Sequence, residues 1–198
     1  MPPISPTIGQ PINLPTPFGE LQVRHVQAGN KEGIAIAKSG EFSNPVPVRI
    51  QSSCLFSESI LATNCDCAAQ LHAALEIISA GGLLVYLYEE GRGAGLRTKI
   101  EAVRIMDQLK CDTAEAYRHL NLDPDLRNYE AACSIVRDIL GIDREIVLIT
   151  NNPNKVVASR NHGLKVVSRM PLVCRINEEV ERYLNEKARV LGHKLDHD

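Results

Sequence analysis

Residues 83–96 read LLVYLYEEGRGAGL, the stretch with the clearest structural signal in the chain. Residues 83–88 are all apolar or aromatic, a run with the length and composition of a buried β-strand. Residues 89–95 form a glycine-rich segment, and apolar residues then recur at helical spacing from Leu96 to Leu109. The order strand, glycine loop, helix is typical of α/β proteins, where such a loop lies beside a ligand.

The flanking segments predict an α/β chain. Upstream, strand-like runs separated by turn-forming residues indicate a β meander, and a helix follows them; downstream, helices alternate with short strands. The expected strands are residues 21–27, 33–38, 46–51, 83–88, 146–149 and 164–167, and the expected helices are 68–80, 96–109, about 114–120, 129–140, one from Pro153 and one from about Asn177. We expect a mixed sheet with an N-terminal β meander and surrounding helices, in a single domain over residues 1–198.

Proline is concentrated at the N-terminus, at positions 2, 3, 6, 11, 15 and 17. Because proline fixes φ and lacks a backbone N–H, it disfavours helices and sheet interiors. We expect residues 1–13 to be an extended or mobile arm, with no regular structure before Glu20.

Composition and charge exclude several function classes. Lysine and arginine total 22 against 24 acidic residues, so no basic field favours nucleic acid or anionic membranes. Tryptophan is absent, which leaves little material for base stacking. No apolar run approaches the roughly 20 residues that cross a bilayer, and the N-terminus has no signal-peptide pattern. We expect a cytoplasmic protein with reduced cysteines that binds neither nucleic acid nor membrane.

Three of the six cysteines are clustered in sequence. Cys54, Cys65 and Cys67 occur as C-x10-C-x-C, and the close pair precedes an expected helix in the polar segment NCDC. Thiolates at this spacing can supply three corners of a zinc tetrahedron, and an open fourth position is typical of catalytic zinc. The alternative is that the cysteines are buried as small apolar residues, which is our interpretation of Cys111, Cys133 and Cys174.

Several segments together resemble the GTP cyclohydrolase II family, whose members open the guanine ring of GTP at the start of riboflavin synthesis. The resemblance spans about residues 14–190. The segments are LPTPFG at 14–19, VRIQSSC at 48–54, CDCAAQL at 65–71, EGRGAGL at 90–96, DTAEA at 112–116, DLR at 125–127 and LITNNPNK at 148–155.

The resemblance implies a zinc site, a nucleotide site and two catalytic residues. Cys54, Cys65 and Cys67 would hold one Zn²⁺ per chain, whose bound water attacks C8 of the purine and leads to release of formate. Substrate-binding roles are implied for Arg49, Gln70, Glu90, Arg92, Thr113, Thr150 and Lys155. A surface salt link is the alternative for Glu90 and Arg92, and a solvated helix-face lysine is the alternative for Lys155.

Asp125 and Arg127 match the family's proton acceptor and nucleophile for pyrophosphate release. An arginine nucleophile is chemically awkward, because the guanidinium is rarely neutral, so a phosphate clamp is the alternative role for Arg127. The triphosphate would also call for Mg²⁺. Family members are typically homodimers.

The chain departs from the family pattern most clearly at Val103, where the family normally carries a tyrosine near the purine and the zinc. Valine has no hydroxyl to donate a proton, so Val103 is a candidate for determining the product. The leading prediction is hydrolysis of GTP with release of formate and pyrophosphate. Alternatives are a specialised paralogue that stops at the formylated pyrimidine, an enzyme for another purine nucleotide, and a nucleotide-binding module with structural zinc.

Overall fold

The computed structural model describes residues 4–174 and 178–195 and contains one mixed eight-stranded sheet. The strands are β1 (Thr7–Ile8), β2 (Ile12–Thr16), β3 (Gly19–Ala28), β4 (Lys31–Lys38), β5 (Val46–Ser52), β6 (Leu83–Leu87), β7 (Glu145–Ile149) and β8 (Lys165–Met170). Their order is β1-β3-β4-β6-β5-β7-β8, with β2 also paired to β3. The predicted mixed α/β fold is confirmed.

The helices are α1 (Leu55–Ser59), α2 (Cys67–Ile78), the short 3₁₀ helix η1 (Gly91–Gly93), α3 (Leu96–Leu109), α4 (Thr113–His119), α5 (Glu130–Leu140), α6 (Pro153–Asn161) and α7 (Glu178–Leu191). The sequence missed α1 and η1, which are too short for a periodic signal. Asn177, the expected start of the last helix, lies outside the described residues. None of the helices described is long and apolar enough to span a membrane.

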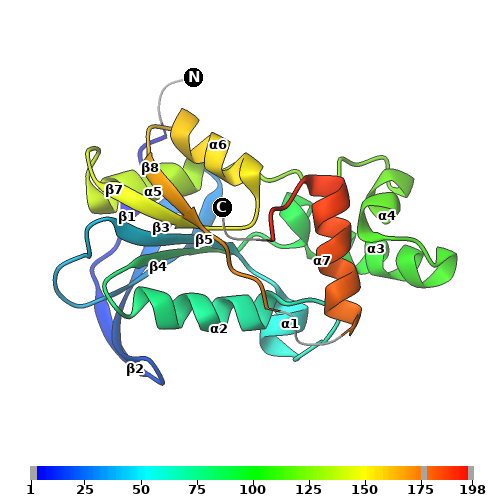
Figure 1. The fold of residues 1–198 in the computed structure, drawn as a ribbon, viewed down its shortest axis with the longest axis horizontal. Helices are drawn as coiled ribbons and strands as arrows, with labels where there is room; N and C mark the ends of the chain where they lie inside the picture. The colour runs from blue at the N-terminus through cyan, green and yellow to red at the C-terminus, as the bar shows by residue number, and fades with distance from the viewer. Residues whose placement is uncertain (1–3, 175–177, 196–198) are drawn as a thin grey trace.

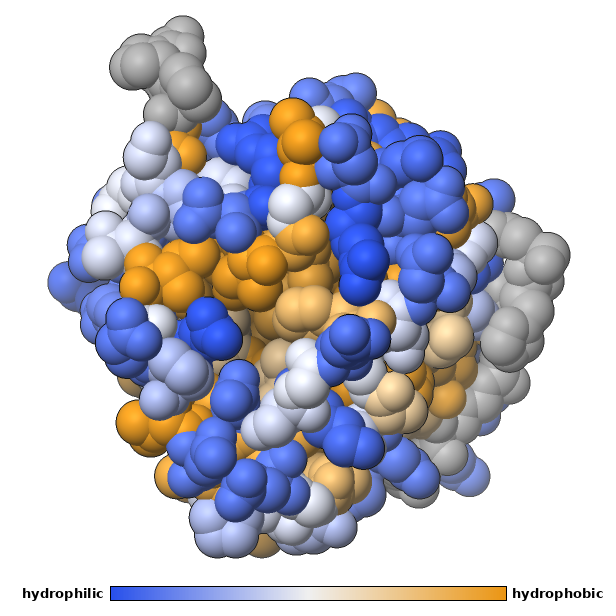
Figure 2. Space-filling model, turned by 90° about the vertical axis from the view of Figure 1, so that its left-hand side faces the viewer, coloured by the Kyte–Doolittle hydropathy of each residue, from blue (hydrophilic) through white to orange (hydrophobic). Residues whose placement is uncertain are grey.

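The helices cover both faces of the sheet (Figure 1). Side chains alternate along β6, so Leu83, Val85 and Leu87 join the apolar core beneath α5, whereas Leu84 joins the core beneath α2. This double burial explains why the β6 segment is continuously apolar. Helices α3, α4 and α7 instead gather beyond one end of the sheet (Figure 1). The opposite end presents an apolar patch ringed by hydrophilic residues (Figure 2).

The prediction that the arm lacks regular structure before Glu20 is wrong. β1 and β2 both pair antiparallel with β3, and Pro15 lies opposite Glu20 in the β2–β3 ladder. Within the described residues β2 pairs only with β3. An edge strand tolerates proline because the missing N–H can face solvent. The Thr16 hydroxyl closes the hairpin by donating to the Gly19 carbonyl at 2.7 Å.

Parallel pairing brings three loops to one edge of the sheet. β5 pairs parallel with both β6 and β7, so the carboxyl ends of all three strands face the same way. The chain leaves these ends toward Cys54, the glycine loop at 89–95 and the segment Thr150–Asn151–Asn152, respectively. Ligands of α/β proteins bind at such an edge.

Candidate functional site

A cavity of about 510 Å³ lies at this edge, closed from the far side by residues of α3, α4 and α7. Twelve of the predicted site residues line it, namely Arg49, Cys54, Cys65, Cys67, Gln70, Glu90, Arg92, Val103, Thr113, Arg127, Thr150 and Lys155. Asp125 is not in the wall but contacts Arg127. Residues far apart in the sequence are thus brought into contact; Lys155 and Ile50, which share a hydrogen bond, are 105 positions apart.

The three clustered cysteines form a metal-sized group. Cys54 precedes α1 and Cys67 begins α2, while Cys65 lies in the loop between these helices. Their Sγ atoms all lie within 4.8 Å of one another, and those of Cys54 and Cys65 are 3.7 Å apart. A tetrahedral site with Zn–S bonds of about 2.3 Å requires sulphur separations of about 3.8 Å. The donor set and spacing therefore fit zinc.

The electrostatics of the cluster favour an ionised thiol. The hydrogen bond from the Cys65 thiol lowers the pKa of Cys54 well below its usual range, and the ammonium of Lys99 acts in the same direction. Cys111, Cys133 and Cys174 are free thiols outside the cluster. No fourth cysteine, histidine or carboxylate joins the group among the residues that the structure describes.

A buried hydrogen-bond network connects the cluster to the sheet. Arg49, at the centre of β5, donates to the Gln51 Oε1 at 2.9 and 2.7 Å, to Gln70 Oε1 at 2.7 Å and to the Ile149 carbonyl at 3.0 Å. Gln70 in turn donates to Asp66, which is fully buried between the two α2-side cysteines. Burial lowers the pKa of Arg49 to about 10. These bonds hold the guanidinium fixed at the cavity wall.

The glycine loop turns the side chains of Glu90 and Arg92 toward the cavity. Glu90 accepts from Gly91 N at 3.1 Å and from Lys99 Nζ at 2.8 Å, and also from the amide of Leu55. Arg92 has a left-handed backbone, with φ of 52°. Its side chain is 10% exposed and that of Glu90 is 12% exposed. The alternative of a surface salt link is therefore wrong for both.

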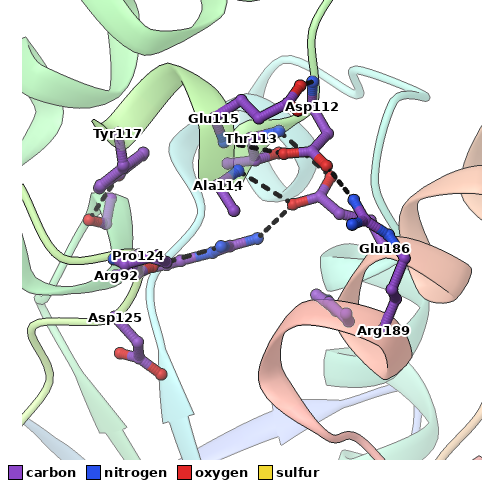
Figure 3. Close-up of polar contacts among 12 residues, drawn as sticks. Arg92, Asp112, Thr113, Ala114, Glu115, Tyr117, Pro124, Asp125, Glu186 and Arg189 are labelled. Atoms are coloured by element: carbon purple, nitrogen blue, oxygen red, sulfur yellow. Dashed lines mark hydrogen bonds and ion pairs between the residues drawn. The ribbon is translucent and has the colours of Figure 1, made fainter. Parts of the chain in front are cut away.

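Figure 3 shows how Arg92 meets the helices beyond the sheet. The Glu186 carboxylate of α7 accepts from the amides of Thr113 and Ala114, both at 3.3 Å, and lies 3.6 Å from Arg92 Nη2. Asp112 caps α4 through Glu115 N at 2.8 Å. Thr113 thus reaches the cavity at the first turn of α4, and α7 is tied to that turn.

Asp125 and Arg127 form a bidentate pair. Arg127 Nε lies 2.8 Å from Asp125 Oδ1, and Nη2 lies 2.6 Å from Oδ2. Burial lowers the pKa of Arg127, but the hydrogen bond to Asp125 and the electrostatic interactions with Tyr129, Asp125 and Tyr183 together outweigh it, so the pKa is raised. The guanidinium is protonated in this arrangement, which makes it a strong anion ligand and a poor nucleophile.

Lys155 and Thr150 lie deep in the cavity. Lys155 is buried, donates to the Ile50 carbonyl at 2.8 Å and lies 5.2 Å from the centre of the Tyr129 ring. The alternative of a solvated lysine is wrong. Burial, with Arg49 and Arg127 nearby, holds its pKa well below the usual range. The Thr150 hydroxyl accepts from Asn152 N at 3.0 Å, which orders the turn into α6.

Sequence reasoning missed several residues of the site. Glu58 accepts from the Cys54 amide at 3.1 Å, from Gln51 at 3.2 Å and from the Tyr86 hydroxyl. Lys99 contacts Cys54, and it could have been found as the residue one helical turn before Val103. No local sequence pattern identifies the cavity-lining residues of α7 and of the turn that follows it. These residues are Arg182, Tyr183, Glu186, Lys187, Leu191 and His193.

Comparisons with known proteins identify the family of this chain. A sequence model of the GTP cyclohydrolase II family matches residues 9–171. GTP cyclohydrolase-2 of Neisseria meningitidis serogroup A is 42% identical over 187 residues, which cover 92% of this chain and 93% of that protein. Riboflavin biosynthesis protein RibBA of Bacillus subtilis is 41% identical over 192 residues, which cover 93% of this chain and 47% of that protein. The chain spans about half the length of such RibBA relatives.

Among solved structures, the crystal structure of RibBX, a two-domain 3,4-dihydroxy-2-butanone 4-phosphate synthase from A. baumannii, matches with a TM-score of 0.49. The sequences are 10% identical, and the match covers 86% of this chain and 41% of that chain. The family match, in contrast, includes every cavity-lining residue named above that precedes α7. Together with the full-length GTP cyclohydrolase-2 relatives, it shows that this chain belongs to the GTP cyclohydrolase II family of hydrolases.

Proposed function

We propose that this chain hydrolyses GTP, opening the guanine imidazole ring at C8 and releasing formate and pyrophosphate, and that it serves riboflavin biosynthesis. The observation that carries the proposal is one cavity that joins a zinc-compatible thiol cluster to several buried cations. The names of the GTP cyclohydrolase-2 and RibBA relatives support the substrate and the pathway. Three waters are consumed, one each in ring opening, deformylation and cleavage of the triphosphate, and the remaining product is a diaminopyrimidinone ribosyl phosphate.

Cys54, Cys65 and Cys67 would hold the metal. A zinc ion held by three thiolates supplies an activated water for attack at C8 of the purine. The purine must then lie over the cysteine side of the cavity, near Val103 and the Arg49–Gln70 pair. The Arg49–Gln70 pair and the Thr150 turn supply the polar wall there.

The cations that line the cavity suit a triphosphate. Arg92, Arg127 and Lys155 carry or can acquire positive charge there, and Lys187 adds a fourth cation from α7. Bidentate guanidinium groups match phosphate oxygens in geometry and charge. We assign Arg127 the role of a clamp that Asp125 orients, with Mg²⁺ accompanying the triphosphate.

The two weaker alternatives are another purine substrate and a binding module with structural zinc. A structural zinc site is closed by four protein ligands. The described residues offer three in one group, which supports the catalytic reading. The family resemblance also implies a homodimer, which light scattering in solution would test.

The experiment is incubation of purified protein with GTP, Zn²⁺ and Mg²⁺, with products identified by mass. We expect the diaminopyrimidinone ribosyl phosphate, formate and pyrophosphate. Cys65→Ser should abolish ring opening and spare nucleotide binding, because the phosphates rest on other residues. Cys133→Ser is the matched control, since Cys133 is buried outside the cluster. Unaltered GTP with wild-type protein, or full ring opening by Cys65→Ser, contradicts the proposal.

A further inference from the structure

Lys99 is the cation closest to the thiol cluster that the proposed mechanism does not use. It lies in the first turns of α3, and its side chain is 18% exposed. Its Nζ is 3.2 Å from Cys54 Sγ and 2.8 Å from Glu90 Oε2. The ammonium also lies 4.6 Å from the centre of the Phe56 ring. A flexible lysine with three partners, two at the start of α1 and one in the glycine loop, is held in one place.

The charge of the cluster gives this placement a role. Zn²⁺ with three thiolates leaves one negative charge, and Cys54 and Cys65 are buried. An uncompensated charge in such a place is costly, whereas a hydrogen-bonded cation offsets it. Lys187 is the other nearby ammonium, but it lies 3.4 Å from Asp66 and thus has its own carboxylate. Among the cationic side chains that the structure describes, Lys99 is the one that donates to a cluster sulphur.

We infer that Lys99 is a positioning residue for the metal centre, whose ammonium donates a hydrogen bond to the Cys54 thiolate and balances the charge of the tri-thiolate site. The inference rests on the proposed function for its metal and adds a residue beyond the three ligands. Groups that hydrogen-bond to metal ligands orient those ligands and tune the metal.

Two consequences follow from this role. The hydrogen bond draws electron density from the Cys54 sulphur, which leaves a bound Zn²⁺ a stronger Lewis acid. Glu90 accepts from Lys99 and belongs to the glycine loop, so the loop that faces the substrate also fixes the lysine at the cluster. Metal retention and loop geometry are therefore linked through one ion pair.

The test compares Lys99→Met and Lys99→Arg with wild type. Zinc affinity is measured by competition with a chelator, and cobalt(II) replaces zinc for absorption spectra. Lys99→Met should weaken zinc binding by about 10- to 100-fold, the usual effect of losing a partner of a metal ligand. It should also move the sulphur-to-cobalt charge-transfer band to longer wavelength, because a thiolate without its donor is more easily oxidised. Lys99→Arg keeps charge and donor, so it should stay near wild type.

Lys110→Met is the matched control. It removes the same charge just after the same helix, but the Lys110 side chain is 80% exposed and pairs only with Asp107 among the described residues. We expect it to bind metal as wild type does. If Lys99→Met does not fold, Lys99→Gln, which can still bond to Glu90, carries the same two measurements.

Unchanged zinc affinity and an unchanged charge-transfer band in the neutral variants would overturn the inference. If wild type binds one zinc per chain and the neutral variants bind zinc equally well, the inference about Lys99 fails and the proposed function stands. A wild-type protein that binds no zinc overturns the proposed metal centre itself. The two failures are therefore distinguishable.

Discussion

Arg127 shows how one ion pair limits the chemistry that a residue can perform. Its guanidinium is bidentate to Asp125 and lies 5.8 Å from the centre of the Tyr129 ring. Each of these contacts stabilises the protonated form. A nucleophile needs a neutral nitrogen with a free lone pair, which this arrangement opposes. The residue is better suited to hold a phosphate group than to attack one.

This assignment predicts the behaviour of Arg127→Ala. GTP affinity and pyrophosphate release should fall together, each by about 10- to 100-fold, as expected for loss of charged hydrogen bonds of about 1.5–3 kcal/mol. Calorimetry measures binding, and a coupled assay measures pyrophosphate. Arg118→Ala, at an exposed position on α4, is the control. Pyrophosphate release that disappears while affinity is retained would instead favour covalent chemistry at Arg127.

Val103 predicts a slow step in the reaction. It lines the cavity one helical turn after Lys99, and its side chain has no hydroxyl that could donate a proton. The phenol of Tyr117 also lines the cavity, but its hydroxyl already donates a hydrogen bond to the Gly91 carbonyl at 2.7 Å. We expect ring opening to outpace formate release, so that a formylated pyrimidine accumulates transiently.

Val103→Tyr should therefore increase the rate of formate release relative to ring opening, because general acid assistance contributes typically about 10²- to 10⁴-fold. Time-resolved mass spectrometry follows the formylated species, and Val157→Tyr, at an exposed position of α6, is the control. Formate release that keeps pace with ring opening in wild type would show that Val103 is a packing residue only.

At the scale of elements, the glycine loop is fitted to the segment that carries Arg127. Gly93 has φ of +89°, and a Cβ there would lie 3.0 Å from the Leu126 carbonyl carbon. Leu126 N also donates to the Arg92 carbonyl at 3.0 Å. The loop and the 125–127 segment are therefore in close contact, and only glycine fits at position 93 without displacing one of them.

Gly93→Ala should lower the free energy of unfolding by about 1–3 kcal/mol and weaken GTP binding, because it strains the backbone and pushes Arg127 away from the cavity. Gly40→Ala isolates the backbone cost, since Gly40 has φ of +110° with no atom within 4 Å of the added Cβ. Urea unfolding and calorimetry measure the two effects. We expect only Gly93→Ala to lose GTP affinity; equal affinity in both variants would contradict the contact.

The turn that follows α7 makes stability depend on pH. His193 lies among cations. Burial lowers its pKa to about 3, and the positive charges of Lys187 and Arg127 act in the same direction. In the unfolded chain a histidine has a pKa of about 6.5, so between these values the unfolded state binds more protons. The free energy of unfolding should therefore rise with pH across this window, by at most about 1.4 kcal/mol per pH unit from this residue.

His193→Gln should flatten this slope between about pH 3 and 6.5 and leave stability above pH 7 little changed. Urea titrations of both proteins at several pH values give the comparison. His162→Gln is the control, because it removes a different histidine, at the C-cap of α6. An identical slope in wild type and His193→Gln would show that His193 is not held neutral.

For the whole molecule, local patterns in the sequence predicted most elements, whereas long-range contacts could not be predicted. The apolar run of β6 and the helical spacing of α3 were sufficient because each signal lies within one segment. The prolines misled the prediction for β2, because an edge strand tolerates what a central strand does not.

The family resemblance named the residues of the cavity, but their partners emerged only from the fold. Lys187 meets Asp66 and Glu186 meets Thr113 across more than 70 residues of sequence, and no local pattern reports such a pairing. Lys99 is similar, since its pairing with Cys54 depends on how α3 packs beyond the sheet.

The central claim is that the thiol cluster makes the cavity a hydrolytic site for GTP, and zinc titration tests it most directly. Metal is removed with a chelator, zinc is returned in steps, and ring-opened product, formate and pyrophosphate are quantified at each step. We predict that ring opening is absent without metal and rises linearly until one zinc per chain, the capacity of Cys54, Cys65 and Cys67. Full ring opening by the metal-free protein would contradict the account.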